Sequence, residues 1–258
     1  MSAPGDSIDG SLALAGCNRA ARAVRMAAIV TIGWAAAGCG VVSHSQNVQG
    51  VQLYQQGQYQ LATTHFEKAI SNDPNAPEGY YNLASTYHRM AKLNNRPEDW
   101  KLAEDTYNMC LDRDPNQRDC HRGLAVLLVE QGRSEQAFRL LEGWASSNPT
   151  SVDAKVELAR LSQEFGNTTA AREHLLEALA INPRDPRALT ALGQIHESSG
   201  NTTQAIAAYQ RSLSNNSMQP DVQARVAALQ SATNTPPPLT PPGATRTVNG
   251  VTAPPVVR

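Results

Sequence analysis

The chain has 258 residues and a formal net charge of −1 at pH 7. Its hydrophobic content is 41%, but aromatic residues make up only 5%, so most apolar residues are Ala, Leu and Val. This composition favours helices packed through small side chains over an aromatic-rich β-sandwich. The balanced charge excludes the strongly basic surface that nucleic-acid binders need, so no nucleic-acid partner is expected.

A basic segment followed by an apolar one opens the chain. Arg19, Arg22 and Arg25 precede the uncharged stretch 26–37. That stretch is shorter than the ~20 residues that span a bilayer. The pattern is typical of a secretory signal, which we predict over residues 1–38. A cytosolic chain that keeps this segment and ordinary secretion with cleavage near Ala37 are the alternatives.

The apolar stretch ends in Ala36-Ala37-Gly38-Cys39. Small residues directly before a cysteine resemble the lipobox of bacterial lipoproteins. The resemblance implies that Cys39 is lipidated, that residues 39–42 form a lipidated linker, and that acyl chains anchor the protein to a membrane. Gly40 in place of Asp resembles lipoproteins sorted to the outer membrane. The expected location is therefore the cell envelope, on the periplasmic side of the outer membrane.

A repeat of about 34 residues follows this segment. Alanines recur in register, each followed four positions later by a large residue, at Ala62, Ala103, Ala137, Ala171 and Ala205. Asp-Pro or Asn-Pro closes the first four copies at Pro74, Pro115, Pro149 and Pro183. Because the residue before proline is driven out of the α region, each dipeptide predicts the end of a helix.

These landmarks resemble the tetratricopeptide repeat, a helix–turn–helix unit with helix A and helix B. The resemblance implies an all-α fold, a right-handed superhelical solenoid of about five units whose stacked neighbours share a core. The array is expected over residues 43–219, with units 43–76, 77–117, 118–151, 152–185 and 186–219. Glycines predict the turns between helix A and helix B, at Gly57, Gly132, Gly166 and Gly200.

The chain after the array changes character twice. Residues 220–231 predict one capping helix, with Pro220 in its first turn. Residues 232–258 carry proline runs and little apolar content, which predicts a disordered, partly polyproline tail.

The second unit is longer than the others, with extra residues between Tyr87 and Ala103. Pro97 and the acids after it predict the start of a lengthened helix. We expect Trp100 to pack on Ala103 and Tyr107, and a projecting anchor is the alternative.

No motif of a catalytic or cofactor-binding site is present. Phosphate-binding loops, zinc-protease helices, nucleophile elbows and C-x-x-C pairs are all missing from the sequence. The six histidines lie at different phases of the repeat and form no spaced ligand set. We therefore expect no enzyme activity, no catalytic residues, no cofactor and no metal.

Two cysteines flank the turn between the second and third units. Cys110 lies late in one helix and Cys120 early in the next. Antiparallel helices around such a turn could bring the Cα atoms within the ~4.4–6.8 Å that a disulfide needs. Two buried thiols are the favoured interpretation, and a disulfide formed in an oxidising periplasm is the alternative.

In tetratricopeptide repeat proteins the partner usually lies along a concave face lined by helix A. Carried over by position, the resemblance implies a groove formed by Asn47, Tyr54, Tyr81, Asn82, Ser85, His88, Arg122, Val126, Arg160 and Gln194. This mixture of aromatic, amide and charged groups suits a protein or peptide segment, whereas an ordinary solvated helix face is the alternative. A clamp for a terminal carboxylate is not expected, because Asp119 would repel the anion.

The lipobox, chain length and repeat number together resemble the TadD-like assembly lipoproteins of tight-adherence (Flp) pili. Pilotins of type IV pili and BamD-like lipoproteins share this plan. The resemblance implies a non-catalytic scaffold that assembles a pilus or secretion machine through protein–protein contacts. Two alternatives are an envelope adaptor that recruits a peptidoglycan hydrolase or protease, and a cytosolic interaction module.

Overall fold

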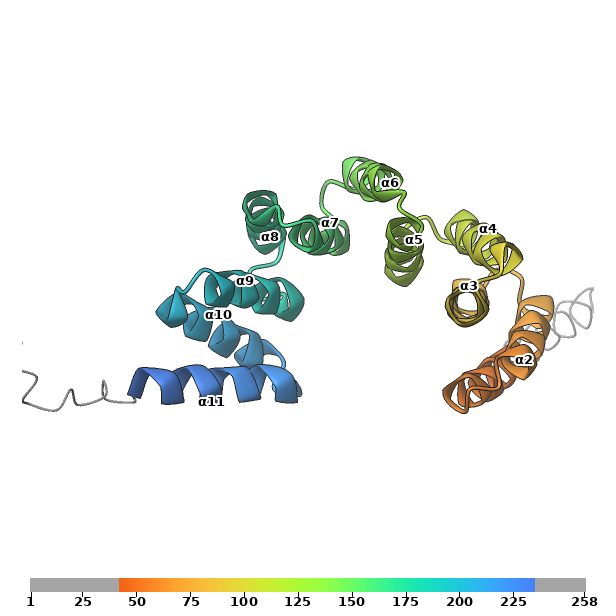
Figure 1. Cartoon of the computed structure of the whole chain (residues 1–258), viewed down its shortest axis with the longest axis horizontal. Coiled ribbons are helices and arrows are strands. Elements are labelled where there is room, and N and C mark those ends of the chain that lie inside the picture. The colour runs from red at the N-terminus through yellow and green to blue at the C-terminus, as the bar shows by residue number, and fades with distance from the viewer. Residues whose placement is uncertain (1–41, 235–258) are drawn as a thin grey trace, which may run out of the picture. The chain divides into compact units, whose positions relative to one another are not determined.

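The structure, a computed structural model, describes residues 42–234, and every regular element in that range is a helix. The predicted all-α fold class is confirmed. Residues 42–55 form the first helix. It is followed by α2 (Tyr59–Asn72), α3 (Pro77–Asn94), α4 (Pro97–Arg113), α5 (Arg118–Glu130), α6 (Ser134–Ser147), α7 (Val152–Glu164), α8 (Thr168–Ile181), α9 (Pro186–Ser198), α10 (Thr202–Asn215) and α11 (Pro220–Asn234) (Figure 1). The predicted signal, Cys39 and residues 235–258 of the predicted tail lie outside the described residues.

The helices alternate as helix A and helix B of successive repeats. Helix A of the five repeats is, in order, the helix at 42–55, α3, α5, α7 and α9. Helix B is α2, α4, α6, α8 and α10. The described residues divide into two compact bodies with a border inside α7, an N-terminal body that ends at residue 161 and a C-terminal body that begins at residue 162. In the first body α2 packs on α3, α3 on α4, α4 on α5 and α5 on α6. In the second body α8 packs on α9, α9 on α10 and α10 on α11.

Turn chemistry separates the helices where the sequence predicts it. Each of the four predicted turn glycines has a φ between 74° and 76°, a conformation that glycine adopts without steric penalty. Between repeats, the side chain before the proline accepts a hydrogen bond from the N–H two residues further on. These bonds measure 3.2 Å at Asp73, 2.9 Å at Asp114 and 3.1 Å at Asn182. The Asx turn therefore ends helix B and sets up the next helix A.

Small residues in helix A bring the two helices of a repeat into close contact. A Cβ atom added at Gly50 would lie 2.5 Å from Cε1 of Phe66, and one at Gly193 would lie 2.5 Å from Cε1 of Tyr209. The five alanines in helix B that mark the repeat are all fully buried. Steric fit at these positions therefore explains the spacing of small and large residues along the sequence.

The insertion in the second repeat lengthens both of its helices. Helix A of the other described repeats with printed bounds has 13 residues, and α3 has 18. Helix B has 14 residues elsewhere, and α4 has 17. Asn95, with a φ of 52°, takes the place of the turn glycine. The predicted lengthened helix does begin at Pro97.

The last helix caps the core of the C-terminal body. Val222 and Val226 of α11 are buried and form one cluster with Ala205 and Tyr209 of α10. Helix α11 continues to Asn234, the last described residue, so it extends three residues past the predicted boundary at residue 231.

The glycines supply a test of the packing. A Cβ atom at Gly123 in α5 would lie 2.5 Å from Cε1 of the buried Tyr107, whereas one at Gly143 in α6 meets no atom within 4 Å. We expect Gly123→Ala to lower the free energy of unfolding by about 1–3 kcal/mol through overpacking. The control Gly143→Ala should raise it by about 0.5–1 kcal/mol, because alanine is the better helix former. Urea denaturation measures both, and equal effects of the two substitutions would contradict the packing described.

Candidate functional site

A pocket of about 250 Å³ lies where the helix A elements of the first two repeats meet in the N-terminal body. Four of the ten predicted groove residues line it, namely Tyr54, Tyr81, Asn82 and Ser85. The remaining lining residues are Val51, Gln55 and Phe66. A fifth predicted residue, Asn47, accepts a hydrogen bond of 2.8 Å from Nδ2 of Asn82. The pocket thus combines apolar side chains with two phenols, two amides and one hydroxyl.

The hydroxyl groups of Tyr81 and its neighbour Tyr107 stay protonated at neutral pH. Burial raises the pKa of Tyr81, and the carboxylate of Asp119 raises it further. Burial also raises the pKa of the neighbouring Tyr107, whose ring centroid lies 6.4 Å from that of Tyr81. Neutral phenols can both donate and accept hydrogen bonds. The arrangement can hold one large side chain of a ligand and bind the polar atoms beside it.

His88 is not part of this pocket. Its side chain is buried, and Nε2 lies 2.9 Å from Oε2 of Glu130 on the next helix A. Lys92 donates a 2.6 Å hydrogen bond to the other oxygen of Glu130. Burial alone would raise the pKa of Glu130, but the hydrogen bonds from Lys92 and His88 outweigh burial and lower it. The structure therefore gives His88 a role in joining the second repeat to the third.

Trp100 lies against the core and also borders a second pocket. Its ring centroid is 5.5 Å from that of His88, and it packs on the core cluster that contains Ala103 and Tyr107. The pocket, of about 570 Å³, is lined by Asn95, Pro97, Trp100, Lys101, Glu104, Glu130 and Gln131. The side chain is half-buried, so packing on the core leaves part of the indole open to this pocket.

Arg122 and Arg160 lie near one buried carboxylate. Nε of Arg160 donates to Oε2 of Glu157 at 3.0 Å, and Nε of Arg122 lies 3.9 Å from the same oxygen. Val126 is half-buried on the same helix as Arg122. Gln194 is half-buried and belongs to the C-terminal body, whereas the other nine predicted groove residues belong to the N-terminal body.

Sequence reasoning missed three contributors to this surface. Gln55 and Phe66 line the first pocket, and Glu157 is the buried partner of the two arginines. Phe66 was identified only as a packing landmark of the repeat. Arg160 follows Glu157 by three residues, and residues so spaced share a helix face. An arginine at this spacing can pair with a buried carboxylate, so it was the feature of the sequence that could have identified Glu157.

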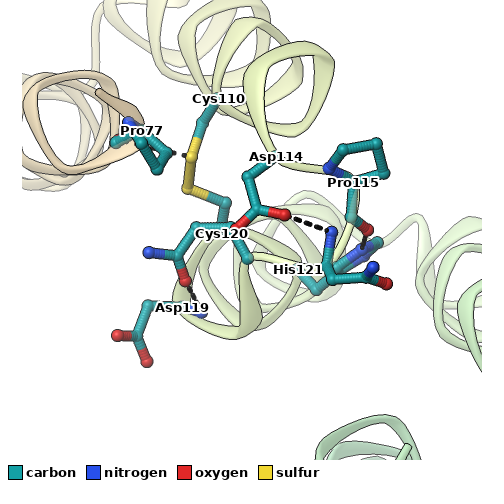
Figure 2. Close-up of a disulfide and its surroundings, with 9 residues drawn as sticks. Pro77, Cys110, Asp114, Pro115, Asp119, Cys120 and His121 are labelled. Carbon is teal, nitrogen blue, oxygen red and sulfur yellow. Dashed lines mark hydrogen bonds between the residues drawn. A yellow bond between two sulfur atoms is a disulfide. The ribbon is translucent and has the colours of Figure 1, made fainter. Parts of the chain in front are cut away.

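Cys110 and Cys120 are joined by a disulfide across the turn between α4 and α5, with a Cα–Cα distance of 6.4 Å (Figure 2). Both residues are fully buried. The structure thus has the disulfide, which was the alternative interpretation, and not the two buried thiols that the sequence analysis favoured.

Next to the disulfide, His121 stacks on Trp144 with ring centroids 4.1 Å apart, and its Nε2 lies 2.9 Å from the carbonyl oxygen of Pro115. Burial lowers the pKa of His121, so the neutral ring fills this joint between repeats.

Two further properties concern residues 42–234 alone. In that range no helix has the length and apolar character needed to cross a membrane. The same residues include no group of three or more His, Cys, Asp or Glu side chains placed to hold a metal ion.

Comparisons with known proteins agree on the repeat. A family model described as TPR repeat matches residues 50–90, and one described as tetratricopeptide repeat matches residues 128–195 and 163–232. Together these matches cover more than half of the chain. No curated protein matches the sequence at a significant level.

Solved structures share the fold. A thermophilic TPR protein of Thermus thermophilus is 26% identical with a TM-score of 0.55, over 73% of this chain and 99% of its own. PilF of Pseudomonas aeruginosa is 18% identical with a TM-score of 0.50, over 76% of this chain and 86% of its own. PilW, described as a widely conserved type IV pilus biogenesis factor, is 19% identical with a TM-score of 0.50, over 74% and 86%. At such identities PilF and PilW show a likeness in fold alone.

The disulfide can be tested by peptide mapping and by stability. Trypsin cleaves after Arg113 and Arg118, so a non-reduced digest should contain the peptides of Cys110 and Cys120 joined to each other. Replacing both cysteines by alanine should lower the free energy of unfolding by about 3 kcal/mol, because the unfolded chain loses a short closed loop. Reduction before unfolding should lower wild-type stability similarly and leave the double variant unchanged. Separate peptides in the non-reduced digest would contradict the bond.

Proposed function

Because the chain belongs to the tetratricopeptide repeat proteins, we propose that it is a non-catalytic scaffold that holds an extended segment of a partner protein. The segment lies on the helix A surface of the N-terminal body. The observation that carries this proposal is the pocket between the first two repeats, with Phe66, Tyr54, Tyr81 and Asn82 in its lining. Aromatic walls around a small cavity are typical of the buried anchor points of protein interfaces.

The polar groups of the pocket suit the backbone of an extended segment. An asparagine side chain has two N–H donors and a carbonyl acceptor. The bond to Asn47 uses one donor of Asn82 and holds the amide in place. The second donor and the carbonyl remain for a partner's peptide group. A pre-oriented amide loses little conformational entropy on binding, which favours affinity.

The place of action that we propose is the periplasmic side of the outer membrane, with the lipidated Cys39 as the anchor. Two features support it. The basic and apolar segment before Cys39 has the layout of a lipoprotein signal, and a buried disulfide is typical of proteins that fold in an oxidising compartment. The work we assign to the scaffold is pilus or secretion-system assembly, as in TadD-like lipoproteins. The fold shared with PilW, itself a pilus biogenesis factor, supports that assignment.

A tryptophan at the rim of the pocket tests the binding proposal. Gln55 lines the pocket and is exposed, whereas Gln52, one turn earlier on the same helix, is exposed but does not line it. We expect Gln55→Trp to obstruct the pocket and to reduce crosslinked capture of pilus or secretin subunits from native envelopes by about tenfold, equivalent to ~1.4 kcal/mol. The matched control Gln52→Trp should capture them as the wild type does, and both variants should keep the wild-type melting temperature. Undiminished capture by Gln55→Trp would remove the pocket from the proposal.

The anchor has its own test. Mass spectrometry of the mature protein from native membranes should find an acylated Cys39 at its N-terminus. The variant Cys39→Ser should be recovered without acyl chains and outside the membrane fraction, because the thiol that carries the lipid is missing. A wild-type chain that keeps residues 1–38 without acylation would overturn the envelope location.

A further inference from the structure

Two arginines share one buried carboxylate on the helix A surface of the N-terminal body. Glu157 is 4% exposed, and Arg160, three residues later on the same helix, binds its Oε2 at 3.0 Å. Arg122, on the previous helix A, lies 3.9 Å from that same oxygen. Both guanidinium groups are always charged. Glu157 thus accepts a hydrogen bond from Arg160, whereas Arg122 lies only at ion-pair distance from it.

The exposed charge of this cluster lies at Arg122. Its side chain is 55% exposed, and its distance to Glu157 exceeds that of a hydrogen bond. The other nearby carboxylate, Asp119, already accepts two hydrogen bonds of 3.0 and 2.9 Å from Arg118. Among residues 42–234, the guanidinium of Arg122 has no hydrogen-bonded partner. Its N–H donors are therefore available to a ligand.

Arg122 belongs to the same surface as the pocket. Helix α5, which carries Arg122, packs against α3, which carries Tyr81. After burial, the charges of Asp119 and Arg122 act on the pKa of Tyr81 in opposite directions, so both lie within electrostatic reach of its hydroxyl. A segment that fills the pocket and continues toward the third repeat therefore meets Arg122.

We infer that the partner segment carries an Asp or Glu side chain that binds Arg122, next to an apolar or aromatic side chain that fills the pocket. This inference rests on the proposed function and specifies the chemistry of its ligand. A neutral segment over Arg122 would remove water from a charged group without replacing its hydrogen bonds, which is unfavourable. A basic segment would add repulsion. An acidic side chain supplies charge-assisted hydrogen bonds, which are the strongest available to a guanidinium.

Peptide pools of defined composition can test this. The probes are fluorescein-labelled heptapeptides with a central leucine and one flanking position varied at a time, acetylated and amidated so that no terminal carboxylate is present. Fluorescence anisotropy against the full-length chain at about 0.15 M salt measures affinity, since lower salt exaggerates surface charge. At one flanking position, Asp and Glu pools should bind at least about fivefold more tightly than Asn and Gln pools.

Arg122→Gln should abolish that preference for acids while leaving the binding of the neutral pools nearly unchanged. The control Arg139→Gln removes the same charge from α6, where the side chain is 66% exposed and pairs with Glu135, and should keep the preference. Pools that bind without any preference for acids, or a preference that survives Arg122→Gln, would overturn the inference and leave the proposed groove intact. Failure of every pool to bind would overturn both.

Discussion

Close contact between helix A and helix B of each repeat is the constraint on which the rest of the structure depends. The ring of Phe66 lies so near the backbone of Gly50 that a methyl group there would overlap it, and Tyr209 lies in the same way on Gly193. Helices that approach this closely exclude water from the alanines between them, which are fully buried. A single pair still exposes one apolar face, so it needs the next repeat to cover it. The disulfide between Cys110 and Cys120 adds a covalent link at one such joint.

This packing occupies one side of helix A and leaves its other side to polar contacts. In the N-terminal body those contacts join each helix A to the next. Asn82 bonds to Asn47 between the first and second repeats, and His88 bonds to Glu130 between the second and third. Arg122 approaches Glu157 between the third and fourth. The three joints differ in charge, from a neutral amide pair to an ion pair that leaves Arg122 exposed, although the core beneath them repeats. The core packing and these polar joints therefore depend on different residues of the same helices.

What the sequence could predict follows from how local each feature is. The small and large residues, the turn glycines and the Asp-Pro or Asn-Pro dipeptides act within one repeat. They carry the resemblance to the tetratricopeptide repeat, from which the helix pairs and their order were predicted. The disulfide depends on the angle at which α4 and α5 leave their turn, and spacing along the chain does not determine that angle. The insertion near Trp100 could have lengthened either helix, and it lengthened both. Residue 231 was predicted as the end of the last helix from a change in composition, but α11 continues to Asn234, because composition alone does not stop a helix.

The candidate site was predictable in outline only, because its character comes from partners that are remote in sequence. Tyr54, Tyr81, Asn82 and Ser85 line one pocket, as residues on successive helix A faces can. His88 was predicted by its position in the repeat in the same way. It instead bonds to Glu130, 42 residues away, between the second and third repeats. Arg122 remains exposed because the two carboxylates near it already bind other arginines. Asp119 binds Arg118, and Glu157 binds Arg160. The pocket at one end and the exposed guanidinium of Arg122 at the other make the surface asymmetric along the repeats. A segment that satisfies both would bind in one direction only, which is how a scaffold built of similar units could orient a partner.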